Sequence, residues 1–310
     1  MVEAVALTGA TGFIGRHLAN ILLAAGYQVR ALARREDPQL RAKGVELWLG
    51  ALDADLDGFV AESDAVVHVA GAVRAGDPRT FHAVNAQGTE WLAAAAASRR
   101  TRRFVLVSSL AARLPQLSAY AASKAAGEAA VLGQAHRMHV VVVRPPGLYG
   151  PEDRATLPLV RNLARGLLLH PDAPGARFSL LYAEDLAHLV LALLAEPPAS
   201  GTILEPDDGR AGGYGWADLA AAAEGQLGRR VRLFRVPRAP LSAAAWLAEQ
   251  QARWSGRPPI LWRSKVAELY HRDWVSDTRA MKAVAGWRPR VPFGEGLVTT
   301  LAWYRAAGWL

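Results

Sequence analysis

Three glycines at the end of a short apolar run set the strongest constraint on how this chain folds. Residues 2–15 read VEAVALTGATGFIG, with the glycines at positions 9, 12 and 15. Val5 and Leu7, with alanines around them, are typical of a strand buried on both faces of a parallel sheet. Apolar residues then recur with helical spacing from Phe13 onward. The stretch therefore predicts a strand that begins at Val2, a tight turn and a helix.

Each glycine has its own role in a turn of this kind. Gly9 allows the sharp turn, Gly12 lets the backbone approach a pyrophosphate, and Gly15 lets the helix pack closely against the strand. The helix N-terminus then offers N–H groups and a favourable dipole to the phosphates. A glycine-rich loop without a ligand has the same pattern, so the dinucleotide interpretation depends on the remainder of the chain.

The second apolar run, Val29 to Ala33, ends in two arginines. An NAD site usually has a carboxylate near this point, which binds the 2′-hydroxyl of the ribose. Here Ala33 is followed by Arg34 and Arg35, and guanidinium groups pair well with a 2′-phosphate. The sequence therefore favours NADP(H) over NAD(H). The alternative is that the two arginines belong to a solvated loop.

The composition excludes several kinds of site and partner. Among the 310 residues there is no cysteine, which excludes disulfides and thiolate metal sites, and we predict no metal site. The net charge is +8, but the basic run at 99–103 lacks the interleaved aromatic residues of nucleic-acid motifs, so no nucleic-acid partner is expected. No apolar run approaches the length of about 18 residues that a membrane span needs. Because the N-terminus lacks a signal-peptide pattern, we expect a cytoplasmic location.

Strands and helices alternate through the first half of the chain. This order predicts an α/β fold with a doubly wound parallel Rossmann sheet, whose ligands lie beyond the carboxyl ends of the strands. We expect Gly9, Arg34, Ala70, Ser109 and Pro145 to gather there. Asn85 and Gly88 mark a kink in the helix predicted over 81–97. The other predicted elements are strands at 45–49, 65–69, 104–107 and 140–143 and helices at 56–61 and 118–136.

The alternation ends after Gly150. A helix over 155–169, a strand over 178–181 and a helix over 184–194 are expected there, followed by short elements rich in tryptophan. We interpret this part as a smaller, mostly helical cap. The predicted domains are an NADP-binding Rossmann domain at 1–150, completed by about 176–204, and a substrate-binding cap at 151–175 and 205–310.

Tyr120 and Lys124 are four residues apart in a predicted helix, so their side chains share one face. A tyrosine ionises near pH 10, at about three units above neutrality, and needs a nearby cation to exchange protons at neutral pH. Lys124 supplies that cation, and Ser109 at the end of the preceding strand can hydrogen-bond the same substrate oxygen. The three residues form a candidate site for acid–base chemistry at a carbonyl or alcohol. The alternative is a helix-face tyrosine beside a solvated lysine.

Eight motifs agree with this interpretation. They are TGATGFIG at 8–15, HVAG at 68–71, VNAQGT at 84–89, VSS at 107–109, YAASK at 120–124, RPPGLYGP at 144–151, YAEDLA at 182–187 and GWRPRVPFGEGL at 286–297. Over nearly the whole chain the sequence resembles the extended short-chain dehydrogenase/reductases, especially their hydroxysteroid dehydrogenase-like and dihydroflavonol reductase-like branches.

The resemblance implies a role for each site residue. Tyr120 becomes the acid/base, Lys124 binds the nicotinamide ribose and lowers the tyrosine pKa, Ser109 donates to the substrate oxygen, and Asn85 is a helix-kink residue that helps relay protons. A homodimer through the helices at 81–97 and 118–136 is also expected. The implied cofactor-binding residues are Gly9, Thr11, Gly12, Phe13, Ile14, Gly15, Arg34, Ala70, Gly71, Tyr120, Lys124 and Pro145.

Two departures from the family pattern stand out. Only ten residues separate Ser109 from Tyr120, which shortens a loop that often lines the substrate pocket. Near position 51, where many members have an aspartate for the adenine, this chain reads LGALD, and Asp53 is the nearest substitute.

Three functions fit these observations. The first is an NADP-dependent oxidoreductase that transfers a hydride between nicotinamide and a carbonyl or secondary alcohol of a lipophilic small molecule. The second is a nucleotide-sugar epimerase or dehydratase, with Arg154, Arg161 and Arg177 as candidate diphosphate ligands. The third is a non-catalytic NADP(H)-binding redox sensor or assembly subunit, against which the intact Ser109, Tyr120 and Lys124 argue.

Overall fold

The structure is a computed structural model that describes residues 3–75, 77–255 and 262–310. Val2, where the first strand is predicted to begin, lies outside the described residues. The chain divides into two compact units. We call the first the sheet unit; it comprises residues 1–144, 186–205 and 277–287. The second unit comprises residues 145–185, 206–276 and 288–310.

Within its described residues, the sheet unit is built on seven parallel strands in the order β11-β6-β5-β4-β1-β2-β3. The six strands predicted in the first half of the chain are all present, with ends that differ by one or two residues, and β11 adds the seventh. The α/β class and the parallel sheet predicted from the sequence are therefore confirmed. The strands are β1 (Ala4–Thr8), β2 (Gln28–Ala33), β3 (Glu46–Leu49), β4 (Ala65–His68), β5 (Arg103–Val107), β6 (His139–Val143) and β11 (Thr202–Leu204).

Helices connect these strands, as a parallel sheet requires. The helix predicted over 81–97 contains a π-helix at His82–Gln87, so Asn85 lies inside the irregular segment and Gly88 begins α5. The helices are α1 (Phe13–Ala24), α2 (Pro38–Ala42), α3 (Leu56–Val60), α4 (Pro78–Phe81), α5 (Gly88–Ser98), α6 (Ala119–Leu132) and α8 (Ala183–Ala195), with 3-10 turns at Leu110–Arg113, Pro115–Leu117 and Thr278–Ala283.

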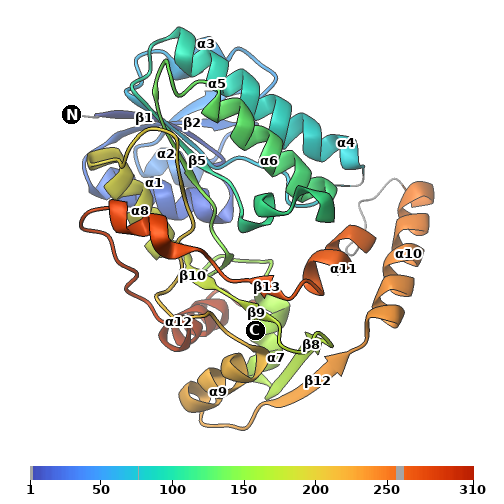
Figure 1. The fold of residues 1–310 in the computed structure, drawn as a ribbon. Coiled ribbons are helices and arrows are strands. Elements are labelled where there is room, and N and C mark those ends of the chain that lie inside the picture. The colour runs from blue at the N-terminus through green and yellow to red at the C-terminus, as the bar shows by residue number, and fades with distance from the viewer. Residues whose placement is uncertain (1–2, 76, 256–261) are drawn as a thin grey trace. The chain divides into compact units, whose positions relative to one another are not determined.

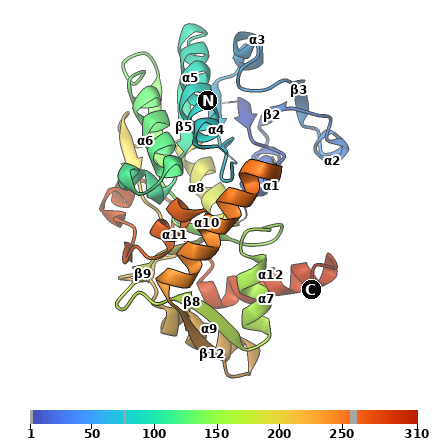
Figure 2. The ribbon, with the colours of Figure 1, turned by 90° about the vertical axis from the view of Figure 1, so that its right-hand side faces the viewer.

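One face of the sheet packs against α3, α5 and α6. Strand residues Ala6, Val66, Phe104 and Val140 are at most 1% exposed there and contact apolar residues of the three helices. Side chains alternate along a strand, so Val5 and Leu7 point to the opposite face, where α1 contacts β1 and β2. Figures 1 and 2 show α5 and α6 side by side over the sheet. The sheet is covered on both faces, which explains the continuous apolar runs in its strands.

The strand register brings the carboxyl ends of the strands to one level. Thr8 is paired with Leu32 of β2 and with His68 of β4, and β5 and β6 continue the same register. The segments that leave these strands therefore depart from the sheet at one edge. The edge holds the predicted site positions Gly9, Arg34, Ala70 and Ser109.

The second unit, outside residues 256–261, combines helices with three two-stranded parallel sheets, β10-β7, β12-β8 and β13-β9. Its helices contain more residues than its strands, in agreement with the mostly helical cap predicted from the sequence. The elements are β7 (Gly147–Tyr149), α7 (Leu157–Ala164), β8 (Leu167–Pro171), β9 (Arg177–Phe178), β10 (Leu180–Tyr182), α9 (Trp216–Leu227), β12 (Arg232–Val236), α10 (Arg238–Ser255), α11 (Arg263–Leu269), β13 (Asp273–Trp274) and α12 (Phe293–Ala306).

Two local predictions for this unit were wrong. The helix expected over 155–169 ends at Ala164, because Gly166 has a left-handed φ of 78° and the next residues pair with β12. The strand expected over 178–181 is divided into β9 and β10, which pair with different partners.

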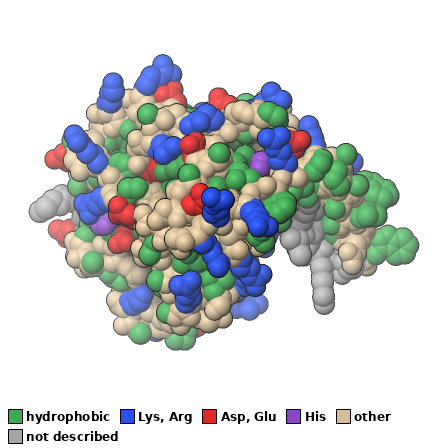
Figure 3. Space-filling model, turned by 90° about the horizontal axis from the view of Figure 1, so that it is seen from below, with side chains coloured by type: hydrophobic (Ala, Val, Ile, Leu, Met, Phe, Trp, Pro, Cys, Tyr) green, Lys and Arg blue, Asp and Glu red, His purple; other side chains and the backbone are tan. Residues whose placement is uncertain are grey.

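The core of the second unit is aromatic, and its tryptophans have different environments. Tyr149, for example, has its ring 5.5 Å from that of Tyr182 and 5.3 Å from that of Phe293. Trp303 and Trp309 pack against the same core. Trp246 and Trp254 of α10 are exposed instead, and hydrophobic side chains gather at the right-hand edge of Figure 3, where α10 lies.

Candidate active site

The glycine turn joins β1 to α1 and leaves the helix N-terminus open. Gly9 has a left-handed φ of 76°, and a Cβ there would lie 2.7 Å from the backbone nitrogen of Ala70. The N–H of Gly12 donates to Gly9 O at 2.9 Å, and Thr11 and Gly12 are exposed. Gly12 is the N-cap residue of α1 without a side-chain cap, and the first turn holds no acidic residue. Both features suit a phosphate at this helix end.

The rest of the motif has a packing role. A Cβ on Gly15 would overlap the carbonyl oxygen of Gly9, so only glycine allows α1 to start this close to the turn. Phe13 and Ile14 form the first turn of α1 and are half-buried. The turn therefore fits the pyrophosphate of a dinucleotide.

The segment after β2 contains both arginines and carboxylates. Arg34 is exposed, and within residues 3–75, 77–255 and 262–310 it forms no ion pair. The two nearby carboxylates are already paired: Glu36 lies 2.7 Å from Arg41, and Asp37 lies 2.6 Å from Arg16. Arg34 therefore contributes positive charge that the carboxylates beside it do not cancel.

A buried histidine connects β1, β4 and α5. His68 Nδ1 lies 2.6 Å from Thr8 Oγ1, and His68 Nε2 lies 2.8 Å from Thr89 Oγ1. The Thr89 hydroxyl donates to Asn85 O at 2.8 Å, so it accepts from Nε2–H, and Thr8 donates to Nδ1. Burial, with a smaller effect of the Lys124 ammonium, lowers the pKa of His68 to about 3. The ring is therefore neutral at physiological pH and fixes the β4 loop against the π-helix.

Asn85 fastens the loop after β4 to helix α6. Its Oδ1 accepts from Ala72 N at 2.7 Å, and its Nδ2 donates to Ala72 O and to Ser123 Oγ, each at 3.0 Å. The Ser123 hydroxyl in turn donates to the carbonyl oxygen of Tyr120 at 2.7 Å. A Cβ on Gly71 would lie 3.1 Å from Asn85 Oδ1 and 3.8 Å from Lys124 Nζ. The Asn85 amide, Gly71 and the Lys124 ammonium are thus neighbours.

Helix α6 carries the candidate tyrosine and lysine. Ser118 caps its N-terminus by accepting from Ala121 N at 2.9 Å. Lys124, one turn after Tyr120, is 7% exposed, and its Nζ donates to Val107 O of β5 at 3.0 Å. Burial lowers the pKa of Lys124 to about 8, although the Glu128 carboxylate opposes this shift. The hydrogen bond to Val107 O holds the ammonium against the end of β5.

Tyr120 lies on α6 with Lys124, and Ser109 lies in the segment that follows β5. The half-buried Tyr120 ring meets the ring of Phe81 edge-on, with 5.9 Å between the ring centres. Ser109 is the second residue after β5, and its Oγ accepts from Ala111 N at 3.2 Å. Lys124 contacts the last residue of β5, two positions before Ser109, so the structure brings these residues to one edge of the sheet. Pro145 follows β6 but is the first residue of the second unit, and Asp53 is exposed after β3.

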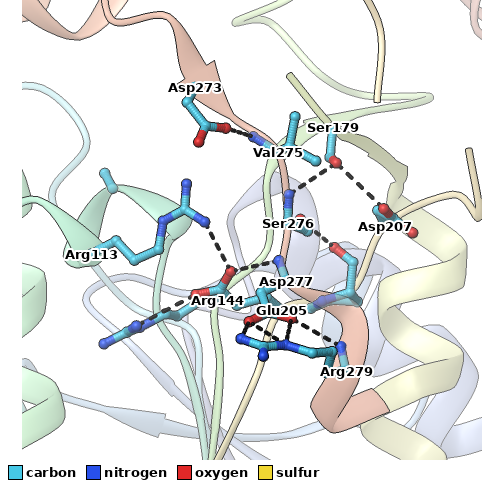
Figure 4. Close-up of polar contacts among 12 residues, drawn as sticks. Arg113, Arg144, Ser179, Glu205, Asp207, Asp273, Val275, Ser276, Asp277 and Arg279 are labelled. Carbon is cyan, nitrogen blue, oxygen red and sulfur yellow. Dashed lines mark hydrogen bonds and ion pairs between the residues drawn. The ribbon is translucent and has the colours of Figure 1, made fainter. Parts of the chain in front are cut away.

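Glu128 of α6 takes part in a buried ion-pair network. Glu128 is 3% exposed; it accepts from Arg144 at 2.6 Å and from the Ser108 hydroxyl. Arg144 also lies 3.5 Å from Glu205, which pairs with Arg113 at 3.3 Å (Figure 4). Arg113 comes from the short segment between Ser109 and Tyr120, so the network ties that segment to the edge of the sheet.

Several of these residues were not predicted from the sequence. Glu128 is four positions after Lys124 on the same helix, and this spacing is a signal that could have revealed it. His68 stands in an apolar strand, where a buried histidine requires hydrogen-bond partners. Ser123 and Thr8 gave no such signal, because their partners are brought close only by the fold.

Metal clusters and membrane-spanning helices are both absent from the part of the chain that the structure describes. Among those residues no group of three or more histidines, cysteines and acidic side chains is placed to hold a metal ion. In the same ranges no helix has both the length and the apolar character that crossing a bilayer requires.

Residues 5–204 match the model of the family described as "NAD dependent epimerase/dehydratase family". This span includes the glycine turn, Ser109, Tyr120 and Lys124. The chain belongs to this family.

Proteins with different named activities are similar to the chain. A ceramide reductase of Caulobacter vibrioides is 37% identical over 99% of this chain and 96% of its own. A 4-hydroxy-2-methyl-3-oxo-4-farnesyl-3,4-dihydroquinoline-1-oxide ketoreductase of Stigmatella aurantiaca is 36% identical over 51% of this chain and 54% of its own. The structure of MoeE5 with UDP-glucuronic acid and NAD has a TM-score of 0.75 at 21% identity, covering 98% and 99% of the two chains. The protein is thus an NAD(P)-dependent enzyme of the epimerase/dehydratase family.

Proposed function

We propose that this enzyme is an NADP(H)-dependent carbonyl reductase, or the corresponding alcohol dehydrogenase, and that its substrate is lipophilic. The observation that carries the proposal is the buried Lys124 ammonium, held on Val107 O one helical turn from Tyr120 and beside the strand that leads into Ser109. A tyrosine, a cation and a hydroxyl donor at one edge of the sheet are the groups that proton transfer at a carbonyl oxygen needs.

In the reducing direction each residue has one task. NADPH, when bound, supplies the hydride to the carbonyl carbon. The Tyr120 hydroxyl gives its proton to the carbonyl oxygen, which becomes the alcohol, and the Lys124 ammonium stabilises the phenolate that remains. Ser109 donates a hydrogen bond to the same oxygen and orients it. Asn85 keeps the β4 loop and α6 together through its bonds to Ala72 and Ser123.

The cofactor would lie along the carboxyl edge of the sheet. Gly9, Thr11, Gly12 and the first turn of α1 fit its pyrophosphate, because no side chain covers that helix end. Ala70 and Gly71 leave room beside β4 for the flat parts of the cofactor. Lys124 would bind the nicotinamide ribose.

The preference for NADP(H) rests on Arg34. Glu36 and Asp37 are paired with Arg41 and Arg16, and these guanidinium groups partly offset the repulsion between the two carboxylates and a 2′-phosphate. Arg34 is exposed after β2, where the 2′ position is expected in this class of fold.

We expect wild-type protein to bind NADPH about 10- to 100-fold more tightly than NADH, because a partly screened charge-assisted pair is worth a few kcal/mol. Arg34→Ala should bring the two dissociation constants within about threefold of each other. Fluorescence titration with both reduced cofactors measures this. Arg137→Ala, at an exposed arginine before β6, is the control and should keep the preference. Equal weakening of both cofactors by Arg34→Ala would contradict the assignment.

The proposed substrate class is based on the named relatives. The relatives at 37% and 36% identity are named as reductases of a ceramide and of a farnesyl-bearing ketone. Both names describe substrates with long hydrocarbon parts. We extend that substrate class to this enzyme.

The competing function, a nucleotide-sugar epimerase or dehydratase, would need basic groups for a diphosphate. The three arginines considered for this are already engaged within the second unit. Arg154 stacks on Trp309 at 4.4 Å, Arg161 donates to Trp309 O at 2.7 Å, and Arg177 donates to the carbonyl oxygens of Gly212 and Gly213 at 2.6 and 2.7 Å. These contacts favour the reductase.

A substrate screen tests the proposed function. We expect NADPH oxidation with long-chain ketones, including a 3-oxo derivative of ceramide, and none with UDP-sugars or dTDP-sugars. Turnover of a sugar nucleotide without an apolar ketone would replace the reductase by the epimerase or dehydratase. Tight NADPH binding without turnover of any carbonyl compound would favour the redox-sensor alternative.

The expected homodimer through α5 and α6 stays a prediction.

A further inference from the structure

The positive charge of the chain is concentrated in one segment of the second unit. Residues 229–265 contain nine arginines and lysines and a single acidic residue, Glu249. The rest of the chain has 27 basic and 27 acidic residues, so the +8 of the whole protein equals the charge of this segment. We call it the basic segment; it covers β12, α10 and the start of α11.

The basic segment also exposes large apolar side chains. On α10, Trp246 is 47%, Leu247 60% and Trp254 91% exposed. At 100° per residue these three positions lie within about 100° of one another around the helix, so they form one face. Ala245, on the other side of α10, is fully buried, and Glu249 pairs with Arg263 of α11 at 2.8 Å. The helix is thus held from one side and presents tryptophan and leucine on the other.

The pair of strands β8 and β12 also exposes large apolar side chains together with arginines. Phe234 of β12 is 47% exposed and is paired in register with Leu169 of β8, which is 55% exposed. Arg232 and Arg235 on β12 are exposed as well, and only two residues separate Arg235 from α10. Figure 3 shows hydrophobic side chains gathered at the edge of the molecule where α10 lies. Basic and apolar groups are therefore interleaved along β12 and α10.

We propose that β12 and α10 form a docking surface for an anionic lipid bilayer. Exposed tryptophan and leucine enter the interfacial region of a bilayer, and surrounding arginines are attracted to anionic headgroups. Both requirements are met within the same stretch of chain. A second copy of this protein would bring an equal positive charge to the same face, which disfavours self-association there.

Vesicle co-sedimentation tests the surface. Wild-type protein should bind vesicles of phosphatidylcholine with about 30% phosphatidylglycerol and should bind pure phosphatidylcholine at least about tenfold more weakly. Binding should fall as salt is raised from about 0.05 to 0.5 M, because screening weakens the headgroup attraction. No substrate or cofactor is needed, so failure of this test leaves the proposed reductase activity untouched.

Two pairs of substitutions separate the apolar from the charged contribution. Trp246→Ser with Trp254→Ser, and separately Arg232→Glu with Arg235→Glu, should each weaken binding at least about tenfold. All four side chains are exposed, so folding is expected to persist, and an unchanged NADPH dissociation constant verifies it. The matched controls are Trp91→Ser on α5, at a tryptophan that is 43% exposed, and Arg79→Glu with Arg137→Glu; both should bind vesicles like wild type.

Three results would overturn the proposal. The first is vesicle binding that is equal in wild type and in both variants. The second is a gel shift of an RNA oligonucleotide that both variants abolish, in protein that does not sediment with vesicles; the basic segment would then bind nucleic acid. The third is a wild-type dimer that Trp246→Ser with Trp254→Ser dissociates, which would make the face an interface between copies.

Discussion

Tyr120→Phe is expected to lower kcat by about a thousandfold and to change the NADPH dissociation constant by less than about twofold. The substitution keeps the ring and its edge-on contact with Phe81 and removes only the hydroxyl that transfers the proton. Steady-state kinetics with the best ketone from the substrate screen, together with fluorescence titration of NADPH, separates the two effects.

Tyr27→Phe is the matched control, because Tyr27 is a half-buried tyrosine of the sheet unit with no part in the proposed chemistry. It should keep wild-type kcat. If Tyr120→Phe retained more than about a tenth of the wild-type rate, general acid catalysis by Tyr120 would be ruled out, since such catalysis is worth at least about a hundredfold.

Gly127→Ala is expected to destabilise the protein and to disable the site together. A Cβ on Gly127 would overlap the carbonyl oxygen of Asn85, a backbone atom of the π-helix that cannot rotate away. Moving α6 from the π-helix should cost about 1–3 kcal/mol, and shifting Asn85 relative to Tyr120 and Lys124 should lower kcat by about a hundredfold. Urea unfolding and steady-state kinetics measure the two effects.

Gly225→Ala provides the comparison for Gly127→Ala. Gly225 lies inside α9, and a Cβ there would have no atom within 4 Å apart from the neighbouring backbone of its own helix. Because alanine favours a helix over glycine, this variant should be as stable as wild type or up to about 1 kcal/mol more stable. If Gly127→Ala and Gly225→Ala had the same free energy of unfolding and the same kcat, the close approach of α6 to the π-helix would have no functional importance.

The sheet was predictable because its signals are local. The strands are short apolar runs, and several of them end at glycine, serine or proline, so six strands and the turn at Gly9 follow from the sequence. The helix predicted over 155–169 was wrong for the opposite reason. The apolar residues at 167–169 suit a helix or a strand equally well, and the partner that decides, β12, is more than 60 residues further along the chain.

The residues of the site also divide into those that local patterns predict and those whose contacts only the fold creates. Tyr120 and Lys124 are recognisable by their spacing on one helix, and the structure adds the contact between Lys124 and Val107 that their spacing does not contain. The bonds of His68 to Thr8 and Thr89 join residues 60 and 21 positions apart. Such pairs form only after strands and helices have packed, so local patterns in the sequence do not indicate them.

The strand order also determines how the protein can assemble during synthesis on the ribosome. β1, the first strand to emerge, lies inside the sheet between β2 and β4. The nascent chain can add β2 and β3 outward on one side, and later β4, β5, β6 and β11 outward on the other, so every new strand joins an edge that already exists. Until β4 has emerged, one edge of β1 stays unpaired, and unpaired apolar edges are sites of aggregation. Because each added strand presents a new unpaired edge, a chaperone that acts on this protein would be needed until β11 has joined β6.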